Sequence, residues 1–106
     1  MESFKNIEDF TPVSKLVRLE NINVRETNIS DIAFLEKNKN IKELNLESCK
    51  NIEVFYPISK LESLENLSNA YTNISDISFL GKNKSIKELY LYGCENIKDF
   101  TPLSKL

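Results

Sequence analysis

A 45-residue repeat runs through the sequence and constrains the fold more than any other feature. The segment NIEDFTPVSKL, residues 6–16, returns as NIEVFYPISKL at 51–61 and as NIKDFTPLSKL at 96–106. When residues 1–61 are compared with residues 46–106, 38 of the 61 pairs are identical. A fixed period of this kind indicates stacked copies of one structural unit, each of which buries its apolar side against its neighbours.

Each 45-residue unit consists of two similar halves, so the smallest repeating element is 22 or 23 residues long. Corresponding apolar residues are Ile22, Leu44, Leu67 and Leu89. Around them apolar and polar residues alternate, which is typical of a short strand with one buried face. We therefore expect a short parallel strand within each of the segments 20–26, 42–48, 65–71 and 87–92. The inward residues that we expect to be almost fully buried are Leu44, Leu46, Leu89 and Leu91.

Beyond each strand the apolar residues fall at every third position, as in Ile52, Phe55, Ile58 and Leu61. In an α-helix a step of three falls about 60° short of a full turn, so these residues would spiral around the helix. In a 3-10 helix, residues three apart lie on the same side. The spacing therefore predicts short 3-10 turns. Pro57 and its counterparts in the other two copies stand where such a turn begins, because the first residues of a helix need no N–H partner.

These segments resemble leucine-rich repeats, whose pattern L-x-x-L-x-L-x-x-N/C-x-L returns every 20 to 29 residues. The segments IKELNLESCKNI and IKELYLYGCENI match it apart from one extra residue after the cysteine, and TNISDIAFL resembles the 22-residue variety of bacterial internalins. The resemblance implies an α/β fold: a short solenoid with a parallel β-sheet on its concave face and 3-10 or other short helical turns on its convex face. We expect one domain over residues 1–106, with about four full repeats, a partial repeat at the N-terminus and no recognisable caps.

The repeat register places both ends of the sequence inside a repeat, since Met1 corresponds to Leu46 and Leu106 to Leu61. An uncapped solenoid end exposes apolar side chains and unpaired backbone groups. Either the chain is cut from a longer array, or its ends pair with another molecule, for example end to end with a second copy.

Composition removes several classes of function. Histidine, the commonest general base and metal ligand, is absent from the 106 residues. The longest apolar runs have four residues, too few to cross a membrane, and the N-terminal segment does not have the pattern of a signal peptide. The excess of lysine, asparagine and isoleucine suggests a low-GC bacterium or its phage. We expect a cytoplasmic protein that is not an enzyme and uses no cofactor or metal.

The two cysteines, Cys49 and Cys94, occupy the position that Thr27 and Thr72 hold in the alternate repeats. In leucine-rich repeats this polar position bonds loop backbone inside the coil. Two repeats separate the cysteines, which is roughly 10 Å at a strand spacing of about 4.8 Å. A disulfide needs Cα atoms within about 7 Å of each other, a metal site needs more ligands, and a nucleophile needs a base. We therefore expect buried, reduced thiols.

Three other polar residues are conspicuous in the repeat pattern. Asp31 and Asp76 are equivalent residues that invite comparison with an acid–base pair, but each precedes a helical turn and is expected to cap it. Asn69 stands at the inward position held by leucine or valine in the other repeats. Either its amide bonds to neighbouring backbone or the third strand is distorted, because an unbonded buried amide costs about 1–3 kcal/mol.

Six lysines form a stripe just before the strands, and its residues are Lys37, Lys39, Lys42, Lys82, Lys84 and Lys87. A basic stripe is one signature of nucleic-acid binding. The net charge of −2, the presence of only two arginines, and Glu43 and Glu88 beside the stripe favour a solvated face instead.

The outward residues of the strands are expected to line the concave face. In strand order they are Asn21, Asn23, Arg25 and Glu26; Glu43, Asn45, Glu47 and Ser48; Asn66, Ser68, Ala70 and Tyr71; and Glu88, Tyr90, Tyr92 and Gly93. These positions diverge between the duplicated copies: Asn45 corresponds to Tyr90, and Glu47 to Tyr92. Exposed tyrosines are frequent binding anchors, although cross-strand tyrosines also stabilise sheets. We predict a partner-binding site made of Tyr71, Tyr90, Tyr92, Glu47, Arg25 and Asn45.

Three functions are compatible with these residues. The leading hypothesis is a non-catalytic module that binds a protein partner through the concave face. The second is a stand-alone inhibitor of a larger enzyme, for example a phage-encoded antagonist of a defence nuclease, of the anti-CRISPR kind. The third is nucleic-acid binding through the lysine stripe.

Overall fold

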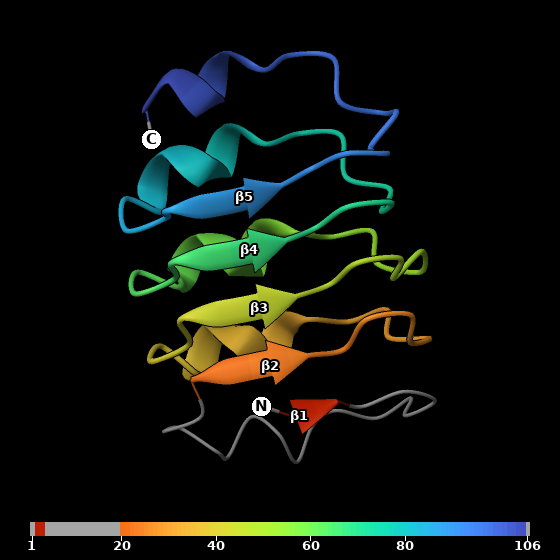
Figure 1. The fold of residues 1–106 in the computed structure, drawn as a ribbon, viewed down its shortest axis with the longest axis vertical. Helices are drawn as coiled ribbons and strands as arrows, with labels where there is room; N and C mark the ends of the chain where they lie inside the picture. Colours follow the sequence, from red (N-terminus) through yellow and green to blue (C-terminus); the bar gives the residue numbers. More distant parts are fainter. Residues whose placement is uncertain (1, 4–19, 106) are drawn as a thin grey trace.

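The computed structural model describes residues 2–3 and 20–105, which form a coil of stacked repeats (Figure 1). The strands are β1 (Glu2–Ser3), β2 (Asn21–Asn23), β3 (Glu43–Asn45), β4 (Asn66–Ser68) and β5 (Glu88–Tyr90). The 3-10 helices are η2 (Ala33–Lys37), η3 (Tyr56–Lys60), η4 (Ser78–Lys82) and η5 (Thr101–Lys105). The strands lie side by side on one face of the coil, and the 3-10 helices lie behind them (Figure 1).

The strands form one five-stranded parallel sheet in chain order. Ile22 pairs with Leu44, Leu44 with Leu67, and Leu67 with Leu89, so equivalent residues of successive repeats are neighbours. Each of the four expected segments contains one of these strands, and short 3-10 helices replace any longer α-helix. The predicted architecture, a short solenoid with a parallel β-sheet on one face and short 3-10 helices on the other, is confirmed.

The first strand departs from the repeat register. Glu2 pairs with Ile22, whereas the 45-residue repeat equates Glu2 with Glu47 and therefore with Arg25. The strand is shifted by three residues relative to the alignment. Pro12, which was expected to begin a helical turn, lies outside the described residues.

The core follows the predicted apolar positions closely. Leu44 and Leu46 expose only 2% and 1% of their surface, and each fully buried aliphatic side chain of this size stabilises the fold by about 1.5–3 kcal/mol. The expectation of near-complete burial is wrong for Leu89 and Leu91, which are only partly buried. The reason is that, among the described residues, no strand pairs with the far side of β5, so these side chains pack against one neighbouring repeat instead of two.

The 3-10 helices begin as the sequence indicates. Pro57 lies in the first turn of η3. Asp31 accepts a hydrogen bond from the N–H of Ala33, and Asp76 accepts one from the N–H of Ser78, both at 2.9 Å. Each aspartate thus bonds the first N–H of the 3-10 helix as expected, but from the residue before the N-cap position, which Ile32 and Ile77 occupy. The bond from Ser78 stabilises the carboxylate and lowers the pKa of Asp76 below its ordinary value.

A ladder of hydroxyl and thiol groups runs through the interior of the coil. The thiol of Cys49 donates to the carbonyl of Val24 at 2.9 Å, and that of Cys94 donates to the carbonyl of Asn69 at 3.1 Å. The Oγ1 of Thr27 lies 3.7 Å from the sulfur of Cys49. Both cysteines are free and buried, as predicted.

The backbone continues regularly from β4 into Asn69, because the N–H of Asn69 donates to the carbonyl of Tyr90 at 2.9 Å, as that of Leu46 does to the carbonyl of Ser68 one repeat earlier. The Asn69 side chain is completely buried, and neither of its amide atoms has a hydrogen-bond partner. Both alternatives raised from the sequence are therefore wrong. The strand keeps its shape, and the unbonded amide is a local cost to stability.

Candidate binding surface on the sheet

Three tyrosines form a contiguous aromatic cluster at the ends of the last two strands. Tyr71, Tyr90 and Tyr92 expose 47%, 45% and 55% of their surface. The ring of Tyr92 stands edge to face with that of Tyr71 at a centroid distance of 5.3 Å, and with that of Tyr90 at 6.5 Å. Such pairs contribute about 0.5–1.5 kcal/mol each beyond their buried area. The structure therefore brings the three predicted anchors together, and we call them the tyrosine cluster.

Glu47 connects the tyrosine cluster to Arg25. Arg25 Nε donates to Glu47 Oε1 at 2.9 Å, and the hydroxyl of Tyr92 donates to Glu47 Oε2 at 3.5 Å. The negative charge of Glu47 raises the pKa of Tyr92, because it disfavours a phenolate nearby. The side chain of Glu47 is only 16% exposed, whereas that of Arg25 is 50% exposed. Arg25 is thus a half-exposed charge at the edge of the surface, and Glu47 is a largely buried carboxylate that links Arg25 to Tyr92.

Ala70 does not line the surface, contrary to expectation, because its side chain is completely buried. It occupies the same place in its repeat as Glu47 and Tyr92 do in theirs. The hydroxyl of Tyr92 reaches Glu47 two repeats away, and the small methyl group of Ala70 at the position between them leaves room for this. The large side chains on either side therefore cover Ala70.

The third residue after each of the strands β2 to β5 adopts a left-handed backbone conformation. The φ angles of Glu26, Ser48, Tyr71 and Gly93 lie between 55° and 74°, at equivalent positions of four repeats. Asn45 supports this turn, because its Oδ1 accepts the N–H of Glu47 at 2.9 Å. The predicted site residue Asn45 is thus half-buried and has a structural role at the end of β3.

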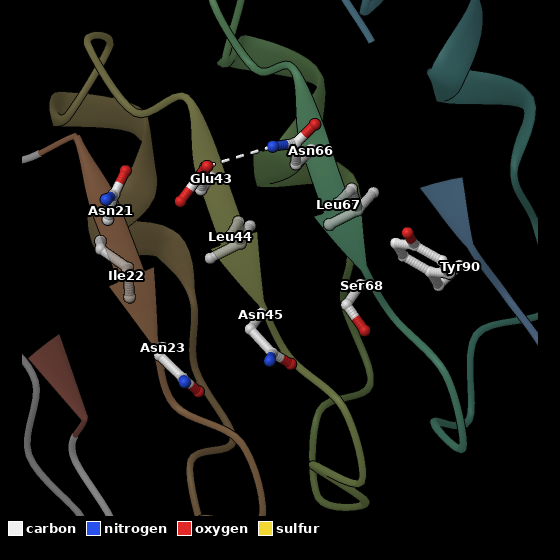
Figure 2. Close-up of a pocket in the computed structure, with 10 residues that line it drawn as sticks. All are labelled: Asn21, Ile22, Asn23, Glu43, Leu44, Asn45, Asn66, Leu67, Ser68 and Tyr90. Atoms are coloured by element: carbon white, nitrogen blue, oxygen red, sulfur yellow. Dashed lines mark hydrogen bonds between the residues drawn. The ribbon is translucent and has the colours of Figure 1, made fainter. Parts of the chain in front are cut away.

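A shallow hollow of about 230 Å³ lies on the sheet beside the tyrosine cluster (Figure 2). Tyr90 lines the hollow from β5, so this ring belongs to both features. Across the hollow, the Nδ2 of Asn66 donates to Glu43 Oε2 at 3.1 Å. Our sequence analysis placed Glu43 and Asn66 on this face but not in the binding site. The available signal was that polar residues occupy the first strand position of all four repeats, at 21, 43, 66 and 88.

Solved structures of similar architecture are known. No family profile and no curated protein matches the sequence. Among solved structures, the chain is similar to an internalin, InlF, from Listeria monocytogenes, with 32% identity over 95% of this chain and a TM-score of 0.86. It is also similar to internalin C2 of the same organism, with 28% identity over 93% of this chain and a TM-score of 0.84.

This chain is a leucine-rich-repeat protein. A third similar structure, with 21% identity and a TM-score of 0.65 over 98% of this chain, is the functional domain of InlJ from L. monocytogenes, which includes a cysteine ladder. At that identity the likeness shows the fold alone. The leucine-rich-repeat chain spans 29%, 43% and 27% of the lengths of these three structures, respectively.

The convex side of the leucine-rich-repeat chain carries a separate aromatic residue, Tyr56, which is 48% exposed. Lys82 Nζ donates to its hydroxyl at 3.0 Å and lies 5.3 Å from the ring centroid, and Lys60 Nζ lies 5.7 Å from that centroid. The hydrogen bond from Lys82 is the largest cause of a lowered pKa for Tyr56. Our sequence analysis did not single out Tyr56, because its lysine partner is 26 residues away.

All six lysines of the stripe are exposed. Lys82 is engaged with Tyr56, and Lys87 lies 3.8 Å from a carboxylate oxygen of Glu65. Within residues 2–3 and 20–105, no helix is long and apolar enough to cross a membrane. In the same part of the chain, no three potential metal ligands come together.

Buried asparagines also join successive repeats, a role that our sequence analysis missed. Asn83, at the end of η4, donates to the carbonyls of Ile58 and Leu61 at 3.0 and 3.1 Å. Asn38 holds the same place 45 residues earlier and is also completely buried. The signal for this role was the repeat of the asparagine within the two KNK motifs.

Proposed function

We propose that this leucine-rich-repeat chain is a non-catalytic module that binds a protein partner through its sheet face, with the tyrosine cluster as the anchor. One observation carries the proposal. Three tyrosines from adjacent repeats hold one another edge to face while about half of each side chain stays open to solvent. An aromatic patch of this kind offers contact area to a partner at little cost in conformational entropy.

The surroundings of the tyrosine cluster support the same function. The hydroxyl of Tyr92 is hydrogen-bonded to Glu47, which in turn is bonded to Arg25. The ring of Tyr92 is therefore already ordered before a partner binds. The parallel strands beneath form a continuous hydrogen-bonded sheet. Preorganisation of this kind reduces the cost of association. Arg25, at the edge and half exposed, is suited to accelerate association with a partner of opposite charge.

The alternative that the tyrosines only stabilise the last strands explains their mutual contacts but not their exposure. An inhibitor of a larger enzyme is a narrower form of the proposed function, because it would use the same sheet face. The identity of the captured partner separates a general interaction module from such an inhibitor.

Affinity capture with matched variants tests the proposal. Wild-type protein, Tyr92→Ala and Tyr56→Ala are used as baits, and Tyr56 is the control because it is a tyrosine of similar exposure on the opposite side. We expect a partner whose capture depends on Tyr92 and not on Tyr56. With the purified partner, a loss of about 2 kcal/mol, roughly 30-fold in Kd, is the hot-spot scale.

The opposite pattern would overturn the proposal. If Tyr92→Ala and Tyr71→Ala remain folded and bind at full strength, the sheet face is not the anchor. If Lys39→Ala and Lys84→Ala instead abolish binding, and binding weakens steeply with salt, the ligand is a nucleic acid held by the lysine stripe.

A further inference from the structure

Tyr56, on the convex side of the coil, departs from the repeat pattern. It is the first residue of η3, and its side chain is about half exposed. The first residues of η2, η4 and η5 are Ala33, Ser78 and Thr101. Two lysines lie against the phenol, since Lys82 Nζ donates to its hydroxyl at 3.0 Å and Lys60 Nζ lies 5.7 Å from its ring centroid. Both ammonium groups are within the range at which a cation interacts with an aromatic ring.

The two lysines belong to the repeat pattern, whereas the tyrosine does not. Lys60 ends η3, four residues after Tyr56, and Lys82 ends η4, which packs against η3 in the next repeat. Lys37 ends η2 in the same way. The backbone of two adjacent repeats thus brings both lysines to this place, and the phenol at position 56 is the feature that distinguishes η3 from the other helices.

A carboxylate is also missing beside Tyr56. The residues two positions before η2, η4 and η5 are Asp31, Asp76 and Asp99, whereas Val54 precedes η3 at this position. In the last repeat the hydroxyl of Thr101 donates to Asp99 Oδ1 at 2.7 Å. An aspartate at this position therefore reaches the side chain of the first helical residue. Because η3 has valine instead, Tyr56 has two cationic neighbours without that anion.

The two cations favour the ionised form of the phenol. The hydrogen bond from Lys82 stabilises the phenolate, and the charges of Lys82 and Lys60 act in the same direction, so the pKa of Tyr56 lies below its ordinary value. Further charged residues on the neighbouring segments are Glu36, Lys37, Glu53 and Asp76. Within the described part of the chain, none of these four forms a hydrogen bond or ion pair with the phenol. Tyr92 is the opposite case, because its hydroxyl donates to a carboxylate.

We propose that Tyr56 is a modification site, at which the phenol oxygen takes up a group from electrophiles of the arylsulfonyl class. The phenolate oxygen attacks the sulfur of an arylsulfonyl fluoride, so that an O–S bond forms and the S–F bond breaks. Fluoride leaves with the bonding electron pair, and the phenol proton passes to water. Lys82 and Lys60 stabilise the attacking phenolate. The proposal is independent of partner binding, which uses the opposite side of the coil.

The probe is benzenesulfonyl fluoride, added to the folded protein at about pH 8, and peptide mass spectrometry follows the adduct at each tyrosine. The tyrosine cluster is the internal reference, because its three side chains are about as exposed as that of Tyr56. We expect Tyr56 to react at least about fivefold faster than each of them, since the fraction of phenolate sets the rate below the pKa. Tyr92 should be the slowest of the four.

Matched variants identify the groups that are responsible. Lys82→Met removes the charge but keeps an unbranched side chain, and it should slow the reaction at Tyr56 about fivefold. Lys82→Arg keeps the charge and should retain most of the rate. Lys84→Met is the control, because it removes a lysine two residues away that is not among the contacts of Tyr56. Val54→Asp restores the aspartate of the other repeats and should slow Tyr56 without affecting Tyr90.

Several results would overturn the proposal. They are equal rates at Tyr56 and in the tyrosine cluster, an adduct on Lys82 or Lys60 in place of Tyr56, or an unchanged rate in Lys82→Met. Backbone amide spectra establish that each variant is folded. In urea the four tyrosines should react alike, because Lys82 is 26 residues away from Tyr56 and only the fold brings them together. A preference for Tyr56 that survives unfolding would also contradict the proposal.

Discussion

The ring of Tyr71 lies against Gly93, in the space where a β-carbon of residue 93 would stand. A methyl group there would overlap the ring carbons Cδ1 and Cε1 of Tyr71. Residue 93 also has a φ angle of 74°. The three equivalent residues have side chains and still adopt this conformation, so contact with the ring, more than backbone strain, is what requires glycine at this position.

Gly93→Ala should therefore destabilise the last repeat by about 1–2 kcal/mol, because it adds left-handed strain and displaces Tyr71. The measurement is urea unfolding of the wild type, Gly93→Ala, Tyr71→Ala and the double variant. We expect Gly93→Ala to cost less in the Tyr71→Ala background, where the ring is absent. Equal costs in the two backgrounds would show that the ring contact has no energetic effect.

Two buried asparagines should respond oppositely to substitution by leucine. Asn69→Leu removes an unbonded amide and places there the residue found at Leu46 and Leu91, so we expect about 1–3 kcal/mol of stabilisation. Thermal unfolding should report a rise of about 4–8 °C per kcal/mol. A lower melting temperature would mean that the amide of Asn69 has a favourable partner, such as an internal water molecule.

Asn83→Leu should destabilise the fold, because it leaves the carbonyls of Ile58 and Leu61 without their hydrogen bonds. A buried carbonyl that loses its partner costs about 1–3 kcal/mol. The same thermal unfolding experiment measures the effect. A stability equal to that of the wild type would show that these bonds do not hold η4 to the preceding repeat.

The thiols should be inert in the folded protein and reactive once it unfolds. Cys49 is fully buried and Cys94 is 9% exposed in the last repeat, so we expect labelling to require opening of the structure and to reach Cys94 first. Thiol labelling with and without denaturant, followed by mass spectrometry, gives the order. Rapid labelling of Cys49 under native conditions would contradict its place inside the coil.

Tyr56 and Tyr92 should ionise at opposite ends of the tyrosine range. The pKa of Tyr56 is lowered by Lys82 and that of Tyr92 is raised by Glu47, relative to an ordinary value of 10.0. Because the folded pKa of Tyr56 is lowered, the folded protein gains stability from its ionisation as the pH rises through that pKa. Because the folded pKa of Tyr92 is raised, its contribution to stability is lost as the pH rises through that pKa. Lys82→Met should raise the first pKa and Glu47→Gln should lower the second, as measured by NMR of the ring carbons. A shift of both values in either variant would point to a general change in structure.

The repeat pattern was sufficient to predict the strands, their order and the thiol ladder, because each depends on residues that recur at a fixed spacing. It did not predict burial that depends on contacts between one particular repeat and its neighbour. Ala70 is buried because Tyr92, 22 residues away, extends across it, and no periodic pattern contains that side-chain direction. Leu91 is partly open because no described strand pairs beyond β5. The tyrosine cluster was predictable from divergence between the copies, but the tie from Tyr92 to Glu47 was not.

The alternation of threonine and cysteine along the interior also determines how many repeats such an array can gain or lose without bringing two cysteines together. Two junctions between neighbouring repeats place a hydroxyl beside a thiol, Thr27 beside Cys49 and Thr72 beside Cys94. Adding or removing a whole 45-residue unit preserves each junction. Excising only the repeat that carries Thr72 would set Cys49 beside Cys94 at one strand spacing, about 4.8 Å, a separation at which two cysteines are able to form a disulfide. A disulfide between Cys49 and Cys94 would therefore show that a single repeat, and not a pair of repeats, had been removed.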